Sequence, residues 1–166
     1  MNNNAMSRFP IISVLQGRPA AIAQIAGSDS YPQITGTVRL YTHEQGVLLY
    51  AQINGLPETE QKCEGRFFGF HIHEGRACTG TIKDPFAESK SHYNPDDCRH
   101  PDHAGDLPPL LGNDGLAVMA VLTDRFSVDE AIGKTVVIHD RPDDFTSQPA
   151  GNAGTKIACG VIRRNA

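Results

Sequence analysis

The sequence predicts an all-β domain in which short antiparallel strands form a sandwich or a barrel. The 166-residue chain contains 16 Gly and 11 Pro, and these residues separate short apolar runs. Such punctuation is typical of turn-rich β proteins rather than of helix bundles. Residues 35–42 alternate polar and apolar side chains, and a Glu-Gln-Gly turn separates them from the run 47–53. That pair predicts a β-hairpin.

Seven segments have the length and composition of strands. In chain order they are 20–25, 35–42, 47–53, 67–73, 116–122, 135–139 and 156–162. Turn residues separate the first segments, for example Asn54-Gly55 followed by Pro57. Residues 127–132, with Ser127 three positions before Glu130, fit a single helical turn that begins with a capping box.

Two long polar segments, 74–111 and 140–154, show no sustained periodicity. The first has about forty residues, and loops of that length inside a small domain are usually functional or disordered. A bound metal that fixes the first loop would explain its length, because the loop is rich in histidine and aspartate.

Composition excludes several functions. The formal net charge is −4 and no segment is rich in Lys or Arg, which argues against nucleic-acid partners. No apolar stretch approaches the roughly 18 residues that span a bilayer, so we expect no membrane insertion.

We expect residues 1–18 to be an N-terminal segment, a candidate for disorder, and residues 19–166 to form a single domain. Because no secretory signal is visible, the protein is expected to be cytoplasmic, or exported with its signal removed.

Six of the seven histidines fall in an array that resembles a set of metal ligands, and one aspartate lies close to it. The array comprises His71, His73, His92, His100, His103, Asp106 and His139. Imidazole is the commonest metal-binding side chain, and several imidazoles with one carboxylate suit zinc or copper. Seven ligands are too many for one tetrahedral ion. Two adjacent metals that share a ligand would use all of them.

The spacing within the array supports this interpretation. His71 and His73 are two positions apart on a predicted strand, so their side chains leave the same face. His139 ends an apolar strand and lies either at its rim or in a site. Any one of these histidines alone would be an ordinary solvated residue. His43 is the only histidine outside the pattern, and we expect it at the surface beside a turn.

The four cysteines allow three disulfide pairings, and none of them forms a Cys-x-x-Cys motif. Four reduced thiols would be equally compatible with the spacing, above all in a cytosolic protein.

Five sequence segments occur in a recognisable order between residues 35 and 162. They are 69–74 (Gly-Phe-His-Ile-His-Glu), 92–95 (His-Tyr-Asn-Pro), 103–108 (His-Ala-Gly-Asp-Leu-Pro), 133–139 (Gly-Lys-Thr-Val-Val-Ile-His) and 151–162 (Gly-Asn-Ala-Gly-Thr-Lys-Ile-Ala-Cys-Gly-Val-Ile). In order and approximate spacing they resemble copper/zinc superoxide dismutase. The resemblance implies a Greek-key β-sandwich or flattened barrel of eight antiparallel strands with two long functional loops.

The resemblance also implies two ligand sets. Copper would be bound by His71, His73, His92 and His139. Zinc would be bound by His92, His100, His103 and Asp106, so that His92 bridges the two ions. The implied activity is the dismutation of superoxide to O2 and H2O2, in which copper cycles between oxidation states and His92 carries a proton. The alternative is a non-enzymatic copper-binding or copper-handling protein on the same fold. A zinc hydrolase would need an open zinc position, which the implied zinc set closes.

Further roles follow from the resemblance alone. Asp143 matches an aspartate that links ligands of both metals, although Asp144 is equally available in the sequence. Lys156 replaces the family's active-site arginine, and Arg141 stands where the family often has a lysine. The implied disulfide joins Cys78 and Cys159, which leaves Cys63 and Cys98 as a candidate second pair.

This chain also departs from the family pattern. The spacing from His100 to His103 is shorter than in the familiar eukaryotic enzyme, and the loop after His139 is short as well. Residues 163–166 are Arg-Arg-Asn-Ala, where the eukaryotic dimer contact is apolar. We therefore expect a monomer or a homodimer.

Overall fold

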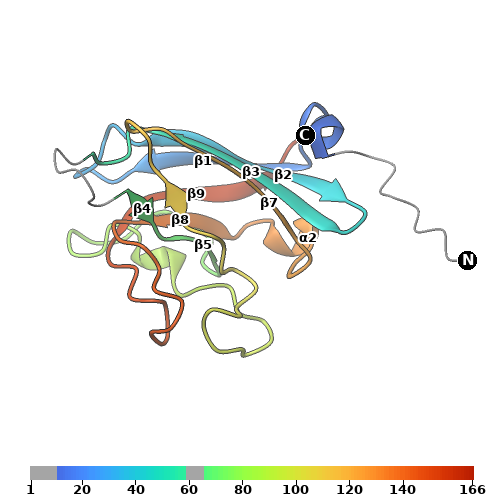
Figure 1. The fold of residues 1–166 in the computed structure, drawn as a ribbon. Helices are drawn as coiled ribbons and strands as arrows, with labels where there is room; N and C mark the ends of the chain where they lie inside the picture. The colour runs from blue at the N-terminus through green and yellow to red at the C-terminus, as the bar shows by residue number, and fades with distance from the viewer. Residues whose placement is uncertain (1–10, 59–65) are drawn as a thin grey trace, which may run out of the picture.

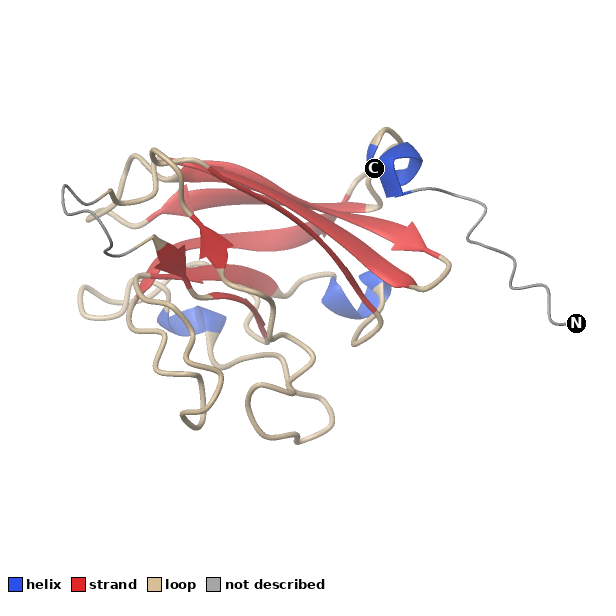
Figure 2. Cartoon of the chain, viewed as in Figure 1, coloured by secondary structure: helices blue, strands red, loops and turns tan. Residues whose placement is uncertain are grey.

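A computed structural model describes residues 11–58 and 66–166 of the chain. The described strands are β1 (Ala21–Gly27), β2 (Thr35–His43), β3 (Gly46–Asn54), β4 (Phe67–Phe68), β5 (Phe70–His73), β6 (Leu110–Leu111), β7 (Ala117–Thr123), β8 (Thr135–His139) and β9 (Lys156–Arg164). Helical structure in the described residues is limited to α1 (Ile11–Leu15), α2 (Val128–Ala131) and the 3-10 turn Ala87–Ser89. Figure 2 shows how far strands and long loops dominate the chain.

Seven strands form one antiparallel sheet in the order β5-β8-β9-β1-β2-β3-β7, and β4 pairs with β6 in a second, small sheet. The large sheet curls, so that β8 and β5 lie beneath β1, β2 and β3 (Figure 1). Strand β9 returns to lie beside β1, which is the neighbour relation of a Greek key. The predicted all-β fold of sandwich or flattened-barrel type is confirmed.

Alternation along the strands separates the core from the functional face. Phe70 and Ile72 of β5 lie in the apolar core, together with Val136 and Ile138 of the neighbouring strand β8. Successive side chains leave opposite faces of a strand, so the histidines of β5 point to the other face. All four residues of β5 are nevertheless buried, because loops cover that second face. The fold therefore creates a buried polar compartment behind the core.

The predicted strand 67–73 is divided into β4 and β5 at Gly69. The backbone of Gly69 donates to the carbonyl of Arg141 at 2.7 Å and accepts from the amide of His139 at 2.8 Å. A Cβ atom at this position would lie 2.8 Å from the Cβ of Ala153, which is closer than real side chains approach. Glycine thus allows β5, β8 and the loop 140–154 to meet at this point.

The predicted helical turn is confirmed as α2. The Ser127 hydroxyl accepts from the amide of Glu130 at 3.3 Å, and the Glu130 carboxylate accepts from the amide of Ser127 at 2.7 Å. These two contacts form the expected capping box. Part of the predicted N-terminal segment, residues 1–10, lies outside the described residues. Helix α1, which follows, contacts β2, because the hydroxyl of Tyr41 donates to the carbonyl of Leu15.

The surface position predicted for His43 is wrong. Its side chain is buried at the end of β2, where its Nδ1 accepts from the amide of Gln45 at 3.1 Å. The turn that we expected to expose it folds back over the ring instead.

The Cys78–Cys159 disulfide is present and joins the long loop after β5 to β9, with 5.6 Å between the Cα atoms. Cys98 is exposed and has no sulfur partner in the described part of the chain. The predicted pairing with Cys63 cannot be placed, because Cys63 lies outside the described residues.

Across residues 11–58 and 66–166, no helix is long and apolar enough to cross a membrane.

Candidate metal centre

The first long loop runs back along β5 and brings its own histidines beside those of the strand. The amide of Tyr93 donates to the carbonyl of Ile72, and the amide of Ile72 donates to the carbonyl of Gly105, both at 2.8 Å. A Cβ at Gly105 would lie 2.1 Å from the carbonyl oxygen of Ile72, so only glycine permits this approach. The loop is thereby fixed against β5 at two points within the predicted zinc set, beside His92 and beside Asp106.

The predicted ligands gather in two buried clusters that share one member. Ligand atoms of the first cluster lie within 4.8 Å of one another and belong to His71, His73, His92 and His139. The same limit holds for the second cluster, formed by His92, His100, His103 and Asp106. Nδ1 of His92 lies 2.7 Å from the Asp106 carboxylate, which leaves its Nε2 for the first cluster. His92 therefore presents its two ring nitrogens to the two sites.

Unpaired ring nitrogens show that these clusters suit metal ions. Within residues 11–58 and 66–166, four buried ring nitrogens have no hydrogen-bond partner: Nδ1 of His71, Nε2 of His92, Nδ1 of His100 and Nδ1 of His103. The last two face the Asp106 carboxylate, at 3.0 and 3.2 Å, as ligands of one ion would. A buried polar atom without a partner costs roughly 1–3 kcal/mol, so four of them at one site require an explanation. Coordination of a cation would satisfy all four lone pairs. The donor set, imidazoles with one carboxylate, is the set that zinc and copper prefer.

The protonation states also fit metal binding. Burial lowers the pKa of His139 to about 3, and burial together with the neighbouring His139 holds the pKa of His73 well below its ordinary value. Burial also lowers the pKa of His71. These histidines are neutral at neutral pH, which is the form that binds metals. Burial opposes ionisation of Asp106, but the hydrogen bond with His92 outweighs it and lowers the pKa of the carboxyl.

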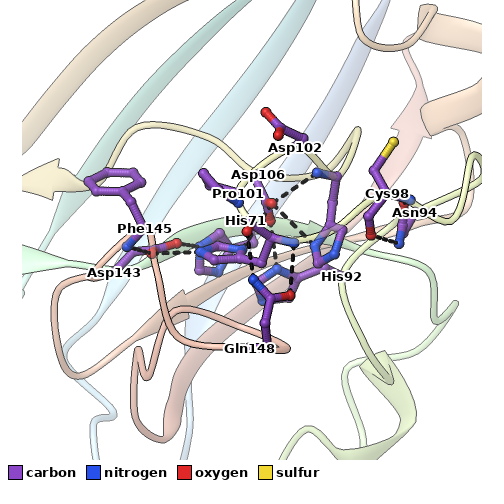
Figure 3. Close-up of polar contacts among 12 residues, drawn as sticks. His71, His92, Asn94, Cys98, Pro101, Asp102, Asp106, Asp143, Phe145 and Gln148 are labelled. Carbon is purple, nitrogen blue, oxygen red and sulfur yellow. Dashed lines mark hydrogen bonds and ion pairs between the residues drawn. The ribbon is translucent and has the colours of Figure 1, made fainter.

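Asp143 links the two clusters from outside. Its Oδ2 lies 2.7 Å from Nε2 of His71, and its Oδ1 lies 2.9 Å from Nε2 of His100 (Figure 3). The pKa of Asp143 is about 2, because hydrogen bonds from His71, from the amide of Phe145 and from His100 outweigh its burial. Asp144, the alternative left open by the sequence, instead accepts from the amides of Thr146 and Ser147 within its own loop.

A cavity of about 500 Å³ opens onto the first cluster, and its lining includes His73, His92, His139 and Lys156. The ammonium group of Lys156 donates to the carboxylate of Asp84 at 3.3 Å and to the carbonyl of Phe86 at 3.2 Å. Arg141 is exposed and does not line this cavity. Its side chain instead lies beside Gly154 on the cavity wall, where a Cβ would be 3.1 Å from Cγ of the arginine.

Sequence reasoning missed two residues that contact the second cluster. The side-chain amide of Gln148 pairs with the backbone of His100, and the guanidinium of Arg125 donates to three carbonyls of the loop around it. Neither residue belongs to a local motif. Both contacts join segments that are distant in the sequence, so no signal in the chain pointed to them.

Comparison with known proteins agrees with this geometry. Residues 34–162 match the family model described as copper/zinc superoxide dismutase. The chain is 36% identical over 147 residues to superoxide dismutase [Cu-Zn] 2 of Aquifex aeolicus, an alignment that covers 79% of this chain and 80% of that protein. It is 33% identical over 180 residues to superoxide dismutase [Cu-Zn] of Escherichia coli K12, covering 95% and 100% of the two chains. The structure resembles that of Cu/Zn superoxide dismutase from Brucella abortus, with a TM-score of 0.69, 25% identity, and coverage of 85% of this chain and 98% of that one.

Proposed function

The chain belongs to the copper/zinc superoxide dismutase family, and from this premise we propose how its own residues serve the dismutation of superoxide to O2 and H2O2. The copper site is formed by His71, His73, His92 and His139, and the zinc site by His92, His100, His103 and Asp106. The observation on which the function rests is the shared position of His92. One ring that belongs to two buried ligand sets has no use in a protein with a single metal.

His92 is proposed to carry the proton that dismutation consumes. Bound copper supplies the reversible one-electron change, while zinc, which has no redox chemistry, keeps its ligands in place. Nε2 of His92 has no hydrogen-bond partner among the described residues, and its ring lines the cavity through which superoxide would enter. A proton held at Nε2 can therefore pass to the reduced substrate. Nδ1 faces Asp106 in the second cluster, so a zinc ion held there would keep the ring in its orientation while the proton leaves.

Lys156 and Arg141 are proposed to attract the substrate anion. The protein has a net charge of −4, so superoxide is repelled by most of the surface and needs a local positive region. Lys156 lines the cavity, with its ammonium group 3.3 Å from the Asp84 carboxylate, and the aliphatic stem of Arg141 lies beside Gly154, another residue of the lining. A lysine retains the positive charge but lacks the rigid two-pronged donor geometry of an arginine. We expect capture of the anion to be retained and its orientation to be looser.

Asp143 is proposed to orient ligands of both metals. Its carboxylate holds Nε2 of His71 and Nε2 of His100 and so leaves Nδ1 of each ring free for an ion. Partners of this kind fix the tautomer and the ring orientation of metal-binding histidines.

The assembly is proposed to be a monomer or a homodimer, which sedimentation at several protein concentrations would distinguish.

The function is tested by metal analysis together with superoxide consumption. Protein that is reconstituted with both ions is expected to bind one copper and one zinc per chain and to consume superoxide rapidly. His92→Ala is expected to reduce the content of both metals and to abolish consumption, because one ring serves both sites. His43→Ala is the matched control, since His43 is buried but lies in neither cluster.

Two outcomes would contradict this account. Full retention of copper and zinc by His92→Ala would exclude a shared ligand. A wild-type protein that binds both metals tightly but does not consume superoxide would instead be a copper-handling protein.

A further inference from the structure

The side chain of Gln148 binds both the backbone N–H and the backbone C=O of His100. The amide of His100 donates to Oε1 of Gln148 at 3.1 Å, and Nε2 of Gln148 donates to the carbonyl of His100 at 2.7 Å (Figure 3). A carboxamide offers one acceptor and two donors, so among side chains it can satisfy a peptide N–H and a peptide C=O together. One side chain thus replaces the pairing that a strand would give to this residue.

The ring of His100 is attached to the same loop. Its Nε2 lies 2.9 Å from Oδ1 of Asp143, five positions before Gln148. His100 is therefore held through its ring and through its backbone by the loop 140–154. This double attachment exceeds what is needed to orient an imidazole, because the contact with Asp143 already fixes the tautomer.

The other side of the zinc loop is held by Arg125. Its guanidinium donates to the carbonyls of Pro101 at 3.0 Å, His103 at 3.2 Å and Asp106 at 3.4 Å. The loop also closes two turns of its own, because the amide of Asp102 donates to the carbonyl of Arg99 at 2.8 Å and the amide of Asp106 donates to the carbonyl of His103 at 3.1 Å. Arg125 supplies a donor to the carbonyls of Pro101 and Asp106, which these two hydrogen bonds leave out.

The loop that contains Gln148 is braced by hydrogen bonds within it. The amide of Asp144 donates to the carbonyl of Gly151 at 2.9 Å, and the amide of Gly151 donates to the carbonyl of Ser147 at 2.7 Å. The Asp144 carboxylate also accepts from the amide of Ser147 at 2.7 Å. Pro149 and Ala150, directly after Gln148, line the cavity above the copper ligands. A displacement of Gln148 therefore displaces this wall of the cavity.

We propose that Gln148 is a positioning residue that couples zinc binding at His100 to the order of the cavity wall formed by Pro149 and Ala150. Zinc binding fixes His100, the amide of Gln148 transmits that constraint, and the wall is held over the copper ligands. Coupling of this kind is reciprocal, so a disordered wall weakens zinc binding by the same factor. The inference rests on the proposed function only in taking His100 as a zinc ligand.

The first test measures zinc release. The fully reconstituted protein is mixed with an excess of a chromogenic zinc chelator, and the rate of zinc loss is followed. Gln148→Ala is expected to lose zinc roughly 10- to 100-fold faster than the wild type, the usual effect of removing an outer partner of a metal ligand. Gln148→Glu keeps the acceptor but loses the donor, and its rate is expected to be intermediate. Gln52→Ala, an exposed glutamine of β3, is the matched control.

The second test compares two metal states of the protein. Hydrogen exchange of the amides of residues 144–151 is measured in the wild-type protein with copper alone and with copper and zinc. Zinc is expected to slow their exchange, and Gln148→Ala is expected to remove this difference. A merely structural role would change exchange equally in both metal states. Either of two results would overturn the proposal. One is zinc release from Gln148→Ala at the wild-type rate, and the other is amide exchange in the wild-type protein that is equally fast with and without zinc. Neither readout involves superoxide, so this proposal and the dismutase assignment can fail separately.

Discussion

Three of the four copper-site histidines, all except the shared His92, are held through the ring nitrogen that does not serve the metal. Nδ1 of His73 lies 2.8 Å from the carbonyl of Lys90, and Nε2 of His71 lies 2.7 Å from the Asp143 carboxylate. Nδ1 of His139 lies 3.4 Å from the carbonyl of Gly154. These partners select one tautomer of each ring before any ion binds, so the site is organised by the fold rather than by the metal.

Lys156 provides the prediction at this scale. Superoxide dismutases are a standard example of electrostatic steering, which raises association rates by roughly 10- to 1000-fold. Lys156→Ala is therefore expected to slow superoxide consumption about tenfold at low salt and to flatten its dependence on ionic strength. Lys156→Arg is expected to retain the rate, because it keeps the charge and presents its donors in a rigid planar fork.

The control for Lys156 is Arg163→Ala, which removes the same charge from an exposed position on the same strand, β9. Stopped-flow measurement of superoxide decay at several ionic strengths distinguishes the two sites. Equal losses in both variants would mean that net charge alone, and not the position of Lys156, governs capture.

At the scale of elements, local sequence patterns predicted most strands. Features that depend on contacts between distant segments could not be predicted. Strand β2 was predicted because polar and apolar residues alternate along it, and β3 because a run of strand composition follows the turn after β2. The division of the strand 67–73 was missed, because it depends on the approach of Ala153 to Gly69. The ligands were predictable since family motifs surround them. Gln148 and Arg125 were not predictable, because they act on backbone groups that only a folded loop brings to them.

The capping box of α2 yields the prediction at the scale of elements. Ser127→Ala is expected to destabilise the protein by about 0.5–2 kcal/mol, as loss of an N-cap usually does. Hydrogen bonds from the Ser127 hydroxyl and amide lower the pKa of Glu130 in the folded state. The contribution of this carboxylate is therefore complete above the pKa of unfolded glutamate and is lost as the pH falls through the lower, folded value.

Urea denaturation of both proteins checks this prediction. The difference in unfolding free energy between wild type and Ser127→Ala is expected at neutral pH and should shrink in acid. A difference that stays constant across this pH range would show that the hydrogen bond from the Ser127 hydroxyl to the Glu130 carboxylate contributes nothing to the cap.

At the scale of the whole molecule, the curled sheet separates two compartments that share β5 and β8. One is the apolar core, and the other is the metal centre, which is closed by loops rather than by a second sheet. Loops have few apolar contacts with which to hold a fixed shape, so covalent and hydrogen-bonded attachments take that role. The disulfide to β9, the backbone pairing with β5 and the contacts of Arg125 and Gln148 together attach the loops to the sheet.

The Cys78–Cys159 disulfide gives the prediction at this scale. Its cysteines are 81 positions apart, and all but two of the metal ligands, His71 and His73, lie between them. Closing a loop of this length stabilises the folded state by up to roughly 4.5 kcal/mol through the entropy of the unfolded chain. The double variant Cys78→Ser/Cys159→Ser is expected to approach this loss in the metal-free protein. Metal-free samples are required because bound ions would stabilise the fold by themselves.

Cys98→Ser is the control, since its thiol is exposed and lies in the same loop as Cys78. The double variant is further expected to bind zinc more weakly than the wild type, because the disulfide anchors the start of the loop that supplies His92 and the zinc ligands. Urea denaturation and zinc titration measure the two effects separately. A double variant that loses stability but binds zinc normally would mean that hydrogen bonds to β5, Arg125 and Gln148 alone shape the zinc loop. The disulfide would then act only on the unfolded chain.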